Sequence, residues 1–313
     1  MMPTPNPYAG ARPHRKSPTW WYLFVGLVTL AFGLLPWMLT GMRLPLQNLW
    51  AADSLPGDMP RALLPFSQYD LSLILSMVIL GTGLAGLAVR AVPAAARPRA
   101  AAYAATGALG ASALAAIQSG TVVRNGLQDT LQAAIYFYAV LAVIVVAALI
   151  GLLALLLLAL GKPPAASIGA TAVALALAIW LRTLVVLPGN EPPLAAMQSL
   201  LGAARWLPLV LVGLAMAWCG IGTIRQGLAW LASLLLLWVV PAVLDGLATA
   251  AGSRALAGNL GEMAVAGARA MLRSLGPTGG SLGEVTVALV VAIGGVFALR
   301  AVAAGKSASS LPS

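Results

Sequence analysis

The stretch that decides the fold runs from residue 130 to residue 161 and reads TLQAAIYFYAVLAVIVVAALIGLLALLLLALG. It contains no charged residue and lies between Asp129 and Lys162. About 20 apolar residues in a helix cross the hydrocarbon core of a bilayer, so this stretch predicts a transmembrane helix over 131–160 that is long enough to tilt. It lacks the alternation of apolar and polar residues that is typical of a barrel strand.

The composition of the whole chain agrees with a lipid environment. Of the 313 residues, 60% are hydrophobic and only 8% are charged, whereas an ordinary soluble domain has about 25% charged residues. So few charges do not cover the surface of a soluble fold of this size. The composition therefore excludes an ordinary soluble enzyme, a disordered chain and a coiled coil, and it favours an all-α, polytopic membrane helix bundle.

The gaps between charged residues predict about eight transmembrane helices in a single domain over 19–304. This domain follows a basic tail, 1–18, and precedes a short tail, 305–313. The uncharged run 192–204 begins with two prolines and is short, so we expect a loop or an interfacial turn there. The outer loops are expected at 43–69 and 251–282. The predicted helices cover residues 19–41, 70–92, 100–118, 131–160, 165–187, 205–223, 228–249 and 283–304.

The distribution of charge predicts the orientation. Ten basic residues and no acidic residue fall on the side of the two termini, whereas the other side holds eight basic and all eight acidic residues. The positive-inside rule then predicts a multi-pass protein of the cell membrane with both termini in the cytoplasm. Because the net charge of +10 comes from juxtamembrane clusters that face anionic lipid, we expect membrane lipids, and protein partners within the membrane, but no nucleic acid.

Small residues mark faces of close helix packing. Gly81, Gly83 and Gly86 lie in the predicted helix 70–92, and small residues recur every four positions from Gly107 in the predicted helix 100–118. Because helix 100–118 is so rich in alanine and glycine, we expect it at the centre of the bundle.

Cysteine and histidine counts limit the chemistry. Cys219 is the single cysteine and His14 the single histidine, so the sequence predicts no disulfide, no metal site, no cofactor and no catalytic set built on these residues. Asp53 and Asp58, on the first outer loop, are the remaining candidates for catalytic acids. More commonly, acidic residues in such a loop are solvated by water or cap the end of a helix.

A polar site is predicted near the outer boundary of the membrane. Arg182 follows Lys162 by 20 residues, and Asp245 follows Arg225 by the same number. Lys162 and Arg225 belong to the basic residues of the inner side, so at ~1.5 Å per residue both Arg182 and Asp245 are expected roughly 30 Å from that side. We therefore expect Arg182 and Asp245 to form an ion pair, with an Arg182 that snorkels alone as the alternative. Pro241 lies one turn before Asp245 and predicts a kink in that helix.

The outer segment 251–282 has the pattern of an amphipathic helix. Its apolar residues recur at helical spacing, and its charged residues fall on the opposite side. We expect it either to lie in the membrane interface or to cover the ends of other helices as a lid. The apolar stripe is formed by Leu256, Leu260, Met263, Gly267 and Met271, and the polar side by Glu262, Arg269 and Arg273.

Three functional hypotheses remain open. The outer connections are the longer ones, and functional residues concentrate on loops, so we expect an extracytoplasmic working face. The first hypothesis is a transporter or permease-like carrier of a lipidic or amphipathic substrate. The second is a non-catalytic membrane subunit or scaffold of a larger envelope complex. The third is a membrane enzyme with an extracytoplasmic site.

Overall fold

The structure, a computed structural model, describes residues 19–47, 49–186, 194–252, 259–276, 279 and 281–309. Within these residues the regular elements are all helical, and the extended pairing is limited to two isolated bridges, Arg43 with Arg61 and Trp50 with Leu127. The elements are two 3-10 helices, η1 (Thr19–Trp21) and η2 (Gln68–Asp70), and ten α-helices: α1 (Tyr22–Gly33), α2 (Leu35–Leu39), α3 (Leu71–Arg90), α4 (Arg97–Gly126), α5 (Leu131–Leu160), α6 (Pro163–Val185), α7 (Leu194–Cys219), α8 (Ile224–Gly252), α9 (Leu260–Leu275) and α10 (Ser281–Ser309).

The all-α membrane bundle predicted from the sequence is confirmed. Among the described residues, seven helices are long and apolar enough to cross a membrane, namely α3 to α8 and α10. The predicted first helix, 19–41, is instead divided at Leu34 into α1 and α2. Pro36 explains the division, because it has no N–H to donate to the carbonyl of residue 32 and its ring crowds that carbonyl.

Several boundaries differ from the prediction because charged residues lie inside helices rather than at their ends. The predicted helix 100–118 is α4, which continues through Arg124 to Gly126. The predicted helix 205–223 is α7, which begins at Leu194 and contains Arg205. The expectation of a loop or turn over 192–204 is therefore wrong from residue 194 onward.

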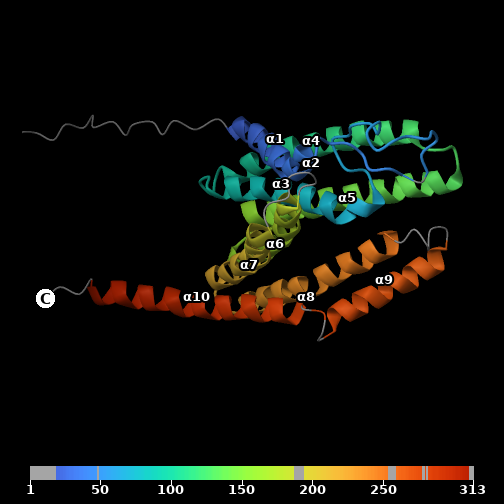
Figure 1. Cartoon of the computed structure of the whole chain (residues 1–313). Helices are drawn as coiled ribbons and strands as arrows, with labels where there is room; N and C mark the ends of the chain where they lie inside the picture. Colours follow the sequence, from blue (N-terminus) through green and yellow to red (C-terminus); the bar gives the residue numbers. More distant parts are fainter. Residues whose placement is uncertain are drawn as a thin grey trace, which may run out of the picture.

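Helix α3 occupies the centre of the bundle and packs against α1, α4, α5 and α6 (Figure 1). Of its 18-residue apolar window, 67% is buried, compared with 39% for α4. The prediction that helix 100–118 is central is therefore wrong. One face of α4 is exposed, with Leu114 65% and Ile117 67% accessible, because small residues allow close contact without dictating how many sides have a neighbour.

The second half of the chain joins the first through α6. Helix α6 packs against both α7 and α8, α7 packs against α10, and α9 packs against α8 (Figure 1). The beginning of α1 and the end of α10 lie toward the same end of the molecule, at the left of the view. We call this the inner end and the opposite one the outer end. The assignment of the inner end to the cytoplasm rests on the charge count.

Glycines bring helix backbones into direct contact. A Cβ atom on Gly107 would overlap the carbonyl oxygen of Leu23 in α1, and one on Gly86 would lie 2.6 Å from the carbonyl oxygen of Leu155 in α5. The same holds at Gly81, whose Cβ would lie 2.8 Å from a Cα of α1. Close packing at these glycines is therefore confirmed.

Arg90 joins three helices at the inner end. Its Nη1 donates to the carbonyl oxygens of Leu158 at 2.6 Å and Gly161 at 3.1 Å, which satisfies carbonyls at the end of α5 that have no partner within that helix. Its guanidinium carbon lies 4.8 Å from the ring centroid of Trp218 in α7. One side chain thus fixes the ends of α3, α5 and α7 relative to one another.

The first outer loop, 43–69, is packed onto the outer ends of α4 and α5. Its interior side chains are buried, Phe66 and Leu64 completely. The Leu64 N–H donates to Ser119 Oγ at 2.8 Å, and Tyr136 donates to the Phe66 carbonyl at 3.1 Å. These long-range bonds make the loop a fixed cover over this end of the bundle.

Candidate functional site

The structure does not bring the two residues of the predicted polar site together. Arg182 is exposed near the end of α6, and Asp245 is exposed on α8. Within the described ranges the single ion pair joins other residues, so Arg182 and Asp245 are not paired. An equal count of residues from the inner end predicts the height of each residue, but it does not fix the direction of its side chain around the helix axis.

Asp245 belongs instead to a helical hairpin formed by α8 and α9. The two helices run antiparallel, and they touch where a Cβ on Gly246 would lie 2.9 Å from the Gly267 carbonyl oxygen. The end of α9 is held to the middle of α8 by the bond from Trp238 Nε1 to the Leu275 carbonyl at 3.2 Å. The hairpin is therefore fixed at two points that flank Asp245.

Helix α9 has the two faces expected of an amphipathic helix. Met263 and Met271 are half-buried and Gly267 is buried on the side toward α8, whereas Glu262, Arg269 and Arg273 are exposed. Asn259 caps the helix by accepting from the Glu262 N–H at 3.2 Å. Leu256, and the side chain of Leu260, lie outside the described residues. The middle of the apolar stripe thus faces a protein neighbour, and contact of α9 with the membrane interface stays a prediction.

Two shallow hollows lie on this hairpin. One has a volume of about 380 Å³ and contains both Asp245 and Arg273. Carboxylate and guanidinium groups thus share one hollow at the outer end of the molecule. Its walls are formed by Asp245, Thr249, Ala270, Arg273, Ser274 and Gly279.

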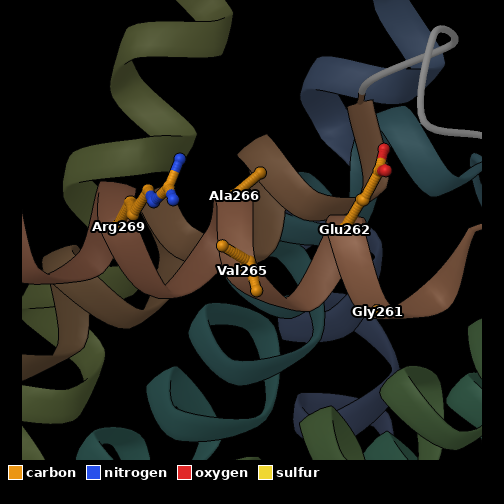
Figure 2. Close-up of a pocket in the computed structure, with 5 residues that line it drawn as sticks. All are labelled: Gly261, Glu262, Val265, Ala266 and Arg269. Carbon is orange, nitrogen blue, oxygen red and sulfur yellow. The ribbon is translucent and has the colours of Figure 1, made fainter.

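The other hollow lies along α9 itself. It has a volume of about 350 Å³ and is lined by residues of this helix, including Gly261. Figure 2 shows Glu262 and Arg269 at its two ends, with Val265 and Ala266 between them. The small residues leave the hollow open, and the two charges give its ends opposite signs.

An ion pair that the sequence analysis missed lies between α7 and α10. Arg205 Nε is 3.5 Å from Glu284 Oε1, and the Arg205 guanidinium carbon is 5.2 Å from the ring centroid of Trp206. Both charged residues lie within membrane-spanning segments. The expectation of a loop over 192–204 places Arg205 at a helix end, whereas the structure places it inside α7.

The remaining candidates for catalytic or metal-binding residues do not form a site in the described part of the chain. Asp53 and Asp58 are both exposed on the first outer loop, where neither is held against a second functional group by any hydrogen bond or ion pair of the described residues. The part of the chain that the structure describes has no group of three or more His, Cys, Asp or Glu side chains placed to hold a metal ion. Helix α8 continues through Pro241, and the predicted kink stays a prediction.

Comparison with known protein families, curated proteins and solved structures finds no match. The class of protein therefore follows from the fold alone. The chain is a polytopic helical membrane protein with a packed bundle, a fixed outer cover and a charged helical hairpin.

Proposed function

We propose that the chain is a non-catalytic membrane subunit, a scaffold that holds partner proteins of an envelope complex. The observation that carries this proposal is the composition of the interior. All eight fully buried polar side chains of the described residues are serine or threonine. The charged side chains of these residues are at least partly exposed, including Asp70 beside the start of α3 and Glu284 in α10. Carriers coupled to an ion usually keep an ionisable group near mid-bilayer, so an interior without a fully buried charged side chain favours assembly over ion-coupled transport.

The apolar surface of α10 supports the same proposal. Only 17% of its apolar window is buried, because among the described residues its main neighbours are α7 and α8. Val290 is 64% and Phe297 65% exposed. A helix with so little contact to its own bundle offers a face to a neighbouring membrane protein.

The test is extraction of the tagged full-length chain with its native lipids, followed by mass spectrometry of the particle. The proposal expects a second polypeptide in constant ratio. A photo-crosslinking residue at Val290 should capture that polypeptide, with Leu149, 60% exposed on α5, as the comparison site. Particles that contain the chain and lipid alone, with both sites crosslinked to lipid only, would contradict a scaffold role.

A second candidate is a carrier of a lipidic or amphipathic substrate with an extracytoplasmic working face. The Arg205–Glu284 ion pair favours it, since charged residues within membrane spans often mark a substrate or ion path. The chain reconstituted in vesicles would then move a fluorescent lipid between leaflets, and Glu284→Gln would change that rate. A scaffold role predicts the same rate of lipid movement between leaflets in vesicles with and without the chain.

A further inference from the structure

We propose that the hollow between α8 and α9 binds a zwitterion with an ammonium group and a phosphate group a few bonds apart, the chemistry of a phosphoethanolamine headgroup. The hollow holds one carboxylate, Asp245, and one guanidinium, Arg273. The two groups form no ion pair with each other in the structure. Both charges therefore remain available to a ligand.

The bonding of the two side chains favours a ligand with two charges. Arg273 Nε donates to the Arg269 carbonyl oxygen at 3.3 Å, which holds the side chain along α9 and leaves its terminal amino groups available. Asp245 accepts no hydrogen bond from the described residues. Both side chains are exposed, so water solvates each charge in the absence of a ligand, and a ligand with a single charge would form an ion pair with only one of them. A zwitterion satisfies both groups at once.

The height of the hollow matches the headgroup region of a bilayer. Asp245 follows Arg225 by 20 residues along α8, a rise of about 30 Å, and the hydrocarbon core is about 30 Å thick. The carboxylate thus reaches the level at which lipid headgroups begin.

The walls of the hollow are held in place before a ligand arrives. The contact of Gly246 with Gly267 fixes the two backbones on one side, and the bond from Trp238 to the Leu275 carbonyl fixes the end of α9. Ordering a mobile site on binding would cost free energy, and a fixed hairpin avoids this cost. The zwitterion site does not depend on the proposed scaffold role, since it uses the hairpin alone.

The experiment measures lipid binding to the delipidated full-length protein by native mass spectrometry. The probes are phosphatidylethanolamine, phosphatidylglycerol, which has the phosphate but no ammonium, and soluble glycerophosphoethanolamine. The proposal expects tighter binding of phosphatidylethanolamine than of phosphatidylglycerol. Displacement of the bound lipid by the soluble probe would identify the headgroup as sufficient, and binding without displacement would identify the membrane lipid as the ligand.

Two nearly isosteric variants locate the site. Asp245→Asn should weaken phosphatidylethanolamine about tenfold and leave phosphatidylglycerol unchanged, because only the ammonium contact is lost. Arg273→Gln should weaken both lipids. Arg269→Gln, which removes an arginine on the same helix outside this hollow, is the matched control and should change neither. Equal binding of the two lipids, or a folded Asp245→Asn protein with unchanged selectivity, would overturn the proposal.

Discussion

Replacement of Arg90 with alanine should destabilise the bundle more than the loss of any other inner-end arginine of the described residues. Arg90 bonds to two carbonyls at the end of α5, at 2.6 and 3.1 Å, and stacks on Trp218 of α7. Its removal separates the ends of three helices and leaves two carbonyls without their charged donor.

The magnitude follows from these contacts. A hydrogen bond to a charged group contributes about 1.5–3 kcal/mol, and a cation–π contact at an exposed site about 0.5–1 kcal/mol. Water at the membrane surface replaces part of the lost bonding to the carbonyls, so we expect a loss of about 2–3 kcal/mol for Arg90→Ala. Arg90→Lys keeps the charge but not the fork of donors, and about half of that loss should remain.

The assay is reversible unfolding in mixed micelles, followed by tryptophan fluorescence. The matched control is Arg99→Ala, since Arg99 is exposed near the start of α4 and forms no hydrogen bond or ion pair with the described residues. This control removes the same charge and should change stability by less than about 0.5 kcal/mol. Equal stabilities of the Arg90→Ala and Arg99→Ala proteins would refute the inference that Arg90 joins the three helices.

Three further predictions follow from the packing, the outer cover and the charge distribution. Gly107→Ala should reduce the free energy of unfolding in detergent by about 1–3 kcal/mol, because its methyl group would meet the α1 backbone. Gly110→Ala, with no atom within 4 Å of its Cβ, should not destabilise the protein and should gain up to about 1 kcal/mol from helix propensity. Trp37→Phe should lose about 1 kcal/mol, measured by the same unfolding assay, because the buried Nε1 donates to a carbonyl of the first outer loop at 2.8 Å; unchanged stability would show that this bond does not hold the loop. In a cysteine-free background, a cysteine at Ala52 should react with an impermeant thiol reagent on intact cells and one at Ala95 should not, and the reverse result would invert the topology.

The sequence by itself determined the class of environment and located seven of the eight predicted long helices, whereas the first, 19–41, is divided into α1 and α2. A segment such as 131–160 is recognised as a transmembrane helix from its own length and composition. This is possible because each segment in lipid must satisfy its own backbone hydrogen bonds. The apolar and charged faces of α9 were likewise visible in the spacing of its residues. The division of the predicted helix 19–41 near Pro36 is also predictable from the sequence, since a proline in a helix interior removes a hydrogen-bond donor.

The tertiary structure decided which charges meet. Counting residues from an inner marker gives the height of a side chain, but its direction around the helix axis relative to a neighbour depends on how the helices pack. For this reason the equal residue counts that predict similar heights for Arg182 and Asp245 do not make them a pair, whereas Arg205 pairs with Glu284 from a helix far along the chain. The hollow that brings Arg273 to Asp245 likewise exists only because α9 folds back along α8, a contact set by the approach of two glycines and not by the pattern of either helix alone.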